Sequence, residues 1–336
     1  MTAPPACVTL GAVIAVRWLR ISLPTPFPVG PVNVYLLPGD PLTLIDAGPY
    51  LEEAWQTLRE ALRAQGFRVG SLRRILLTHS HPDHSGLARR LQEESGAEVY
   101  LHPREHQKLG IEYREEPPWL LACGIPPELI QEAARSREWD SRFLQPLPAV
   151  RPLGEGDQIP GDGYCLRVLH TPGHSSGHLC FYDPNPGLMW CGDTLLEHIT
   201  PNPMVEPCRA EANGRTPSLS LYLSTLNRLA DLEVRQALPG HGAAITSPRE
   251  RIRQMLAHHR QRSEEILAIL RGAGRPLTPW QVALKLYSGL EGENIFLAAS
   301  EVVAHLDALA KRGLVREVGS EHTVYFSSAP RSGAFS

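Results

Sequence analysis

The sequence predicts an α/β (α+β) protein in which a large domain is followed by a small C-terminal domain. One observation is that strand-length apolar runs alternate with helix-spaced segments over residues 15–245, in two halves. Another is a break rich in glycine and proline at 272–276, after which the pattern changes to two helices and a hairpin. The length of 336 residues also exceeds that of one average domain.

The first half begins with consecutive strands and continues with alternating helices and strands. A turn signal at 38–41 separates the first two clear strands. Trp55, Leu58 and Leu62 then repeat at helical spacing. The predicted strands lie at 32–37, 42–45, 75–77 and 98–101, and the predicted helices at 52–65 and 87–94.

The second half begins after an irregular, mostly helical stretch at 103–148, which two Pro-Pro pairs interrupt. Because long insertions near a site are usually lids or binding loops, we expect this stretch to cover the site. Strands are predicted at 164–170, 179–183, 188–192 and 234–238, and a helix is predicted at 218–231.

The C-terminal part begins with one long charged helix at 248–271, which connects the two domains. Helices at 278–287 and 298–312 and a hairpin of strands at 314–318 and 323–326 follow, in the order of a winged helix. The predicted division is a large domain at 1–247, the connecting helix at 248–271, a winged-helix-like domain at 272–328 and a disordered tail at 329–336.

The bulk composition is that of an ordinary globular protein, with 42% hydrophobic and 21% charged residues. A net charge of −3 gives no electrostatic case for binding nucleic acid or an anionic membrane. The apolar run at 7–16 is too short to span a membrane and lacks the pattern of a secretory signal. Six cysteines without a Cys-x-x-Cys pair favour reduced core thiols and a cytoplasmic protein.

Three histidines and an aspartate gather within six positions, directly after the predicted strand at 75–77: His79, His81, Asp83 and His84. Imidazole and carboxylate together suit borderline divalent metals such as zinc, iron or manganese. A His-x-His pair at a strand end can direct two nitrogens at one ion, and the following Asp-His pair can reach a second. Because four such side chains are costly to bury without an ion, the motif predicts a metal site.

Three further ligand-type residues follow downstream, each where an apolar strand gives way to a glycine-rich turn. They are His174 in Pro-Gly-His, Asp193 in Cys-Gly-Asp and His241 in Pro-Gly-His-Gly. Glycine lets the backbone approach closely, and loops on a rigid scaffold commonly carry the chemistry. A single histidine of this kind is more often structural than ligating, so the prediction depends on the ordered set.

This ordered set resembles the metallo-β-lactamase superfamily, and within it the hydroxyacylglutathione-hydrolase-like branch, over residues 15–245. The resemblance implies a four-layer αβ/βα sandwich with the site between its halves. It also implies two divalent metal ions, with zinc expected ahead of iron or manganese. The first ion would be held by His79, His81 and His174, the second by Asp83, His84 and His241, and Asp193 would bridge both.

The expected chemistry is hydrolysis by a water molecule that the two ions share and acidify, because metal binding can bring the pKa of water down to about 7. The resulting bridging hydroxide would attack a carbonyl carbon or a phosphorus atom, and one metal would polarise the attacked oxygen. Asp83 or Asp193 would orient this nucleophile and take up its proton. These two carboxylates are therefore the candidate catalytic residues.

Other polar residues are candidates for supporting roles. Asp46 matches a family position behind the ligands, where it would hydrogen-bond a histidine ligand, with a simple turn cap as the alternative. His178 would also lie behind the ligands or would pack between strands. The loop after Asp193 would line the substrate cleft through Thr194, His198, Thr200 and Asn202.

The substrate has three candidate classes. The branch resemblance implies hydrolysis of a thioester or ester, of the acyl-glutathione or acyl-coenzyme A type. The C-terminal pattern is similar to that of proteins related to β-lactamase-like protein 2, which implies single-stranded RNA cleavage as the alternative. Much of the ligand set is also shared with mononuclear iron persulfide dioxygenases, a second alternative, although those proteins lack a winged helix.

Charge favours a small-molecule ester over nucleic acid as the partner. From residue 272 onward, six Lys or Arg residues balance six Asp or Glu residues, whereas a nucleic-acid-binding module usually presents a basic face. We therefore interpret the C-terminal domain as a packing or dimerisation module. Homodimerisation stays open, and RNA stays the alternative substrate.

Overall fold

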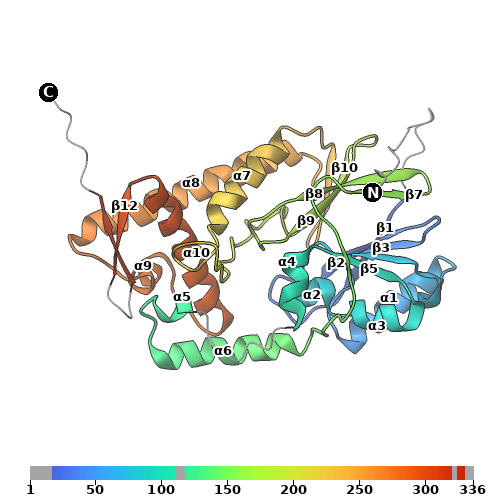
Figure 1. Ribbon diagram of the computed structural model, residues 1–336, viewed down its shortest axis with the longest axis horizontal. Helices are drawn as coiled ribbons and strands as arrows, with labels where there is room; N and C mark the ends of the chain where they lie inside the picture. Colours follow the sequence, from blue (N-terminus) through green and yellow to red (C-terminus); the bar gives the residue numbers. More distant parts are fainter. Residues whose placement is uncertain (1–16, 111–117, 320–323, 330–336) are drawn as a thin grey trace.

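The computed structural model, which describes residues 17–110, 118–319 and 324–329, is a four-layer αβ/βα sandwich joined to a lobe of further helices (Figure 1). Two β-sheets face each other, with the strand orders β1-β2-β3-β4-β5-β6 and β11-β10-β9-β8-β7. The first sheet contains β1 (Leu19–Leu23), β2 (Val32–Leu37), β3 (Thr43–Ile45), β4 (Arg74–Leu76), β5 (Glu98–Leu101) and β6 (Arg151–Pro152). The second contains β7 (Gln158–Gly161), β8 (Tyr164–His170), β9 (Leu179–Asp183), β10 (Leu188–Gly192) and β11 (Gln236–Pro239).

Three hydrophobic clusters hold the four layers together. Leu37 of the first sheet and Phe181 of the second pack in the cluster between the sheets. The neighbouring Leu36 points the other way, as successive strand residues do, and packs with the helices that cover the first sheet. Burial on both faces explains why these strands are continuous apolar runs. The covering helices are α1 (Glu52–Ala64) and α3 (Ala88–Ser95) on the first sheet, and α7 (Ser218–Ala230) and α8 (Pro248–Ala273) on the second.

The predicted elements are present within a few residues of their expected bounds, with two kinds of difference. The short strands β6 and β7 were not predicted, because their hydrogen-bonding partners rather than an apolar run define them. The helix predicted at 298–312 is α10 (Glu293–Lys311) and begins earlier. It starts directly after Gly292, whose φ of 55° is a conformation that glycine adopts at little cost.

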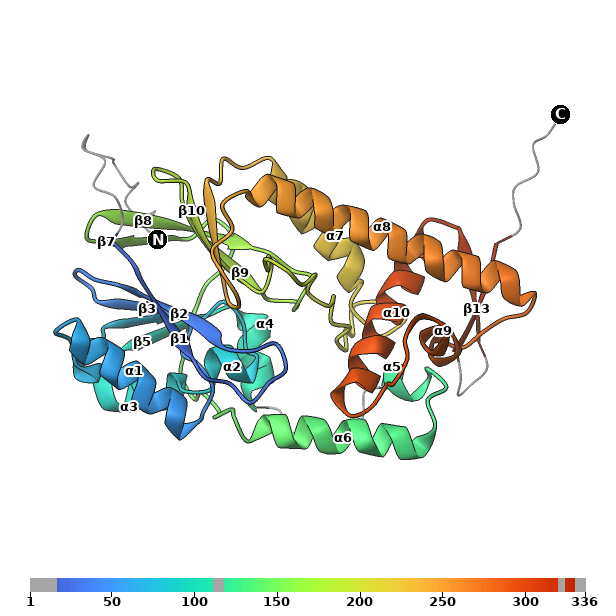
Figure 2. The same ribbon diagram turned by 180° about the vertical axis from the view of Figure 1, so that it is seen from behind.

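The predicted insertion at 103–148 runs along one side of the molecule. It contains α4 (Pro103–His106), the 3₁₀ helix η2 (Gln107–Gly110), α5 (Pro118–Leu121) and α6 (Pro127–Ser141). Figure 2 shows α6 extending from the end of α10 toward the helices of the first sheet. Just after α6, the carbonyl oxygen of Phe143 accepts a hydrogen bond from the N–H of Tyr50 at 2.8 Å. The insertion therefore joins the sandwich to the C-terminal lobe.

The C-terminal helices and the insertion share one hydrophobic core. α9 (Pro279–Leu286), α10 and the hairpin β12 (Val315–Gly319) and β13 (Val324–Ser328) pack with Trp119 of the insertion and Leu270 of α8. The order of two helices and a hairpin agrees with expectation, whereas the winged-helix assignment and the domain boundaries stay predictions. The N–H of Ala329 donates to the carbonyl oxygen of Leu314, and residues 330–336 of the expected tail lie outside the described residues.

No helix in the described part of the chain is both long and apolar enough to cross a membrane. Cys123, Cys180, Cys191 and Cys208 are free thiols. Cys165 is disulfide-bonded, so the expectation of uniformly reduced cysteines is wrong at this position. The apolar run at 7–16 lies outside the described residues.

The start of α9 depends on a reciprocal cap that should contribute measurably to stability. The Thr278 hydroxyl accepts the N–H of Gln281 at 3.1 Å, and the Gln281 side chain accepts the N–H of Thr278 at 3.2 Å. We expect Thr278→Ala to lower the free energy of unfolding by about 1 kcal/mol in urea denaturation, because a backbone N–H loses its partner. Thr278→Ser keeps the hydroxyl and is the control. If the alanine and serine variants were equally stable, the Thr278 hydroxyl would not act as the helix cap.

Candidate metal centre

The polar segment after β4 folds into one turn of helix, which keeps its four ligand-type side chains together. α2 (Pro82–Ser85) begins with proline at its first position, where the missing N–H costs no hydrogen bond. The N–H groups of His84 and Ser85 both donate to the carbonyl oxygen of His81 at 3.0 Å. This turn holds Asp83 and His84 close to the His-x-His pair.

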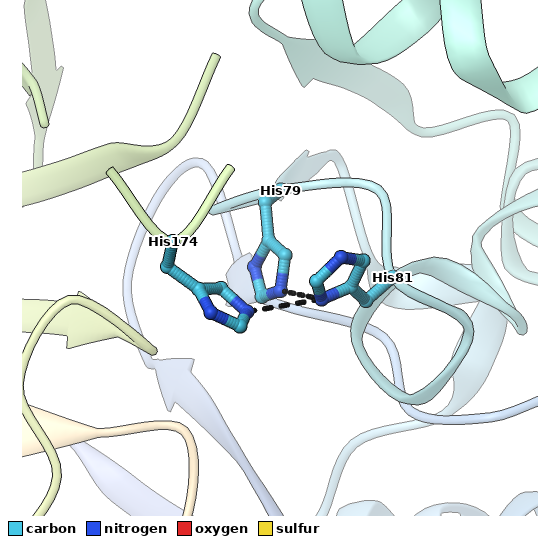
Figure 3. A group of neighbouring side chains, drawn as sticks. All are labelled: His79, His81 and His174. Carbon is cyan, nitrogen blue, oxygen red and sulfur yellow. Dashed lines mark hydrogen bonds between the residues drawn. The ribbon is translucent and has the colours of Figure 1, made fainter. Parts of the chain in front are cut away.

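His79, His81 and His174 converge, although they come from different halves of the sandwich (Figure 3). The Nδ1 atom of His81 lies 3.0 Å from Nε2 of His79 and 3.0 Å from Nε2 of His174. Tetrahedral coordination with zinc–nitrogen bonds of about 2.0–2.1 Å separates neighbouring ligand atoms by roughly 3.3 Å. The three nitrogens are therefore spaced as the ligands of a single ion would be.

A second group forms beside the first from Asp83, His84 and His241. The Oδ2 atom of Asp83 lies 3.1 Å from Nε2 of His241 and 3.9 Å from Nε2 of His84. Asp193 lies between the two groups. Its carboxylate oxygens are 3.4 Å from Nε2 of His84, 3.7 Å from Nε2 of His174 and 3.8 Å from Nε2 of His241.

Several buried polar atoms of this centre lack a hydrogen-bond partner among the described residues. They are Nε2 of His84, Nε2 of His241 and Oδ1 of Asp193. Buried polar atoms are rarely left unpaired, because each one loses its hydration without compensation. A divalent cation would satisfy all three atoms at once, so the residues present fit a metal site.

Electrostatics separates the histidines into two sets. Burial, with help from neighbouring imidazoles, lowers the pKa of His79 and lowers that of His174 to about 4, so both are neutral at pH 7. Burial also opposes protonation of His84, but Asp193, Asp83 and Asp46 together raise the pKa of His84 above its usual value. The carboxylates thus favour a proton on His84, and a metal cation would displace that proton when it binds.

Asp46 hydrogen-bonds two neighbours of this centre. Its Oδ2 atom accepts a hydrogen bond from Nδ1 of His84 at 2.8 Å, and both carboxylate oxygens accept the Thr78 hydroxyl at 3.0 Å. The Thr78 oxygen in turn accepts Nδ1 of His79 at 3.0 Å. Both imidazoles are therefore held in the tautomer that leaves Nε2 free for a metal. Asp46 itself has a φ of 60°, a strained backbone that the surrounding bonds hold in place.

Backbone carbonyl groups orient the two histidines of the downstream turns. Nδ1 of His174 donates to the carbonyl oxygen of Asn202 at 3.1 Å, and Nδ1 of His241 donates to that of Pro31 at 3.0 Å. Each bond leaves Nε2 directed at the centre. These partners are distant in sequence, so no local pattern predicts them.

His178 supports Asp193 rather than joining the ligands. Its Nε2 atom accepts the N–H of Asp193 at 3.1 Å, and Nδ1 lies 3.0 Å from the Thr194 hydroxyl. Gly240 is needed on the opposite side, because a β-carbon there would lie 2.5 Å from Oδ1 of Asp193. This contact explains the glycine in the turn before His241.

A family model described as the metallo-beta-lactamase superfamily matches residues 27–241. The chain belongs to the metallo-β-lactamase superfamily. It is 31% identical to "Probable metallo-hydrolase YqjP" of Bacillus subtilis (strain 168), over 93% of this chain and 98% of that protein. The crystal structure of the metallo-beta-lactamase family protein TTHA1429 from Thermus thermophilus is 33% identical, with a TM-score of 0.79 over 93% of this chain and 98% of that one. With its convergent histidines and aspartates, this superfamily member is a metal-dependent hydrolase.

Two further relatives carry names that bear on the substrate. "Atrochrysone carboxyl ACP thioesterase" of Aspergillus fumigatus is 26% identical over 72% of this chain and 61% of that protein. "Beta-lactamase-like protein 2 homolog" of Drosophila melanogaster is 26% identical over 89% of each chain. Superfamily membership therefore leaves the substrate class open.

A cleft of about 1650 Å³ opens over the metallo-β-lactamase centre. His81, Asp83, His174 and Asp193 line it on the side of the sandwich. The insertion, α8, α10 and the loop between α9 and α10 line other parts of it. The insertion thus lines the cleft, and the C-terminal lobe lines it too. The lobe was interpreted as a packing module, and no local pattern in the chain indicated this additional role.

The loop after Asp193 contributes only two of the four residues expected in the cleft. Thr200 and Asn202 line it. Thr194 is buried beneath, and its carbonyl oxygen accepts the hydroxyl of Tyr222 at 2.7 Å. His198 is exposed outside the cleft and lies 3.2 Å from Glu197. The loop turns inward after Asp193 and reaches the cleft only further on, a path that the sequence does not reveal.

A buried carboxylate that the sequence did not indicate joins the loop of His79 and His81 to the loop of His174. Glu105, on α4, accepts hydrogen bonds from the N–H and hydroxyl of Ser80, at 3.1 and 2.6 Å, and from the N–H of Gly177 at 2.8 Å. Lys108 pairs with it at 2.7 Å and also contacts Glu206. The Glu-x-x-Lys spacing was visible, but it is common on solvated helices.

Proposed function

We propose that this protein uses two divalent metal ions, zinc first among them, to hydrolyse thioesters. The observation that carries the proposal is the position of Asp193. Its carboxylate faces nitrogens of both ligand groups. All seven side chains expected to bind metal lie at this centre, and two ions could share Asp193.

The two ions would supply an acidified water and a Lewis acid for the attacked oxygen. The protein's own residues would orient that water and accept its proton. Burial by itself would raise the pKa of Asp83 and Asp193, but the neighbouring His84 and His241 lower both. Both carboxylates are therefore ionised at neutral pH and able to accept a hydrogen bond or a proton.

The composition of the cleft supports a thioester over a polyanion. Its cationic lining residues are Arg104, Lys108 and Arg209, and Lys108 is already paired with two carboxylates. The lining also includes four carboxylates besides the two at the centre: Asp140, Glu206, Glu293 and Glu301. Much of the remaining wall is apolar, and it includes Phe27, Val29, Leu144, Leu196, Ile199 and Phe296. Such a wall suits an acyl group, whereas RNA phosphates call for clustered cations.

The two alternatives rest on weaker observations. RNA cleavage draws on the likeness to the β-lactamase-like protein 2 homolog, but the cleft lacks a surplus of positive charge. A mononuclear iron dioxygenase needs only one ligand group, and this chain has a complete second group in Asp83, His84 and His241. RNA cleavage is an outcome of the following experiment.

The test is turnover of three substrates by protein loaded with zinc, iron or manganese: an acyl-glutathione, an acyl-coenzyme A and a short single-stranded RNA. We expect hydrolysis of at least one thioester, and we expect the RNA to stay intact. Asp193→Ala serves as the inactive reference, because it removes the carboxylate that both ligand groups face. RNA cleavage together with inert thioesters would overturn the thioester proposal in favour of a nuclease.

A further inference from the structure

The cleft has a polar spot where α8 lines it. His259, on α8, lines the cleft there, although only 2% of its surface is exposed. Neither of its ring nitrogens has a hydrogen-bond partner among the described residues. An imidazole in the wall of a cleft with two buried, unpaired hydrogen-bonding atoms is a candidate ligand-binding group.

The neighbours of His259 do not satisfy it. The rings of Tyr222 and His305 lie with their centroids 5.6 Å from that of His259. The Tyr222 hydroxyl donates to Thr194 instead. His305 has its Nδ1 atom 2.9 Å from the hydroxyl of Ser263. The packing around His259 is thus aromatic, and these neighbours leave both of its buried nitrogens unpaired.

The cation beside this spot is paired with carboxylates. The guanidinium of Arg262, one turn along α8, lies 3.1 Å from Glu301 and 2.9 Å from Glu265. Burial lowers the pKa of His259 to about 4, and His258 and Arg262 act in the same direction. The imidazole is therefore neutral at pH 7 and offers one N–H donor and one nitrogen acceptor.

We propose that His259 binds an uncharged secondary amide in the thiol arm of the substrate, where α8 lines the cleft. A secondary amide also carries one donor and one acceptor, which matches the neutral imidazole. The inference rests on the proposed thioester hydrolysis, because thiol carriers such as coenzyme A and glutathione contain amides. The scissile carbonyl would then lie at the metal centre and the arm would extend along the wall formed by α8 and α10.

The kinetic test uses three thioesters with the same acyl group: acyl-coenzyme A, acyl-glutathione and the acyl thioester of mercaptoethanol, which has no amide. We expect His259→Leu to lower the ratio of kcat/KM for an amide-bearing thioester to that for the amide-free one by about tenfold, as for one lost hydrogen bond. His259→Asn, which keeps a donor and an acceptor, should restore most of this ratio. His305→Leu removes a neighbouring buried histidine that does not line the cleft, so the ratio should stay as in the wild type.

A binding experiment separates this inference from the proposed reaction. S-Ethyl-coenzyme A and S-ethyl-glutathione carry the amides but have neither a thioester nor a free thiol. Isothermal titration calorimetry should show that His259→Leu weakens one of them about tenfold, and the affected compound identifies the carrier. If binding depends on His259 but no thioester is hydrolysed, the subsite stands and the hydrolase proposal fails. Absence of binding to the wild type, or equal binding by His259→Leu, would overturn the subsite.

Discussion

Replacing Asp193 with alanine should abolish hydrolysis and remove at least one equivalent of bound metal. Its carboxylate is the group that faces Nε2 of His84, His174 and His241, at 3.4, 3.7 and 3.8 Å. Without it, two neighbouring dications would lose the shared anion that lowers their repulsion. Since metal catalysis supplies several kcal/mol, we expect turnover to fall by roughly 10³-fold or more. Elemental analysis of the purified protein, together with thioester hydrolysis, measures both effects.

Asp183→Ala is the matched control for that variant. Asp183 is also a buried aspartate of the second sheet, but its Oδ1 atom accepts the N–H of Asn185, at the end of β9. Its loss should leave the metal content unchanged. If Asp193→Ala kept two metals and full activity, the proposed geometry of the centre would be wrong.

Replacing Glu105 with alanine should destabilise the protein strongly, although Glu105 is not one of the expected metal ligands. The side chain is fully buried, and it accepts bonds from Ser80, Gly177 and Lys108. Its removal leaves the buried N–H groups of Ser80 and Gly177 without their acceptor, and it leaves Lys108 paired with Glu206 alone. We expect the free energy of unfolding to fall by about 3–5 kcal/mol. Urea denaturation of metal-free protein measures this change without a contribution from metal binding.

Glu206→Ala is the control for the loss of Glu105. Glu206 contacts the same Lys108, but its side chain is 18% exposed, so its removal should cost less. Glu105→Ala should also weaken metal binding by about 10–100-fold, because Ser80 lies between two of the proposed ligands. If both variants unfolded at the same urea concentration as the wild type, Glu105 would not hold the loops of Ser80 and Gly177 together.

Much of the fold and of the candidate site was predicted from patterns of neighbouring residues in the sequence. Strands such as β2 are buried on both faces, so nearly all of their residues are apolar and the strand is visible as an apolar run in the sequence. The cluster from His79 to His84 was visible because its ligand types lie within one turn of chain. Edge strands β6 and β7 have no such run, and the start of α10 depended on the backbone conformation of Gly292.

The sequence by itself determined the metal-type chemistry of this protein, because ligand identity and chain order are local properties. Tertiary structure alone decided which groups orient those ligands and what the cleft can hold. Asn202 and Pro31 orient histidines far away in sequence, and Glu105 joins two loops from opposite halves. Likewise, His259 reaches the cleft only because α8 packs beside α10. Such contacts depend on how distant surfaces meet, and the spacing of residues along the chain does not encode that.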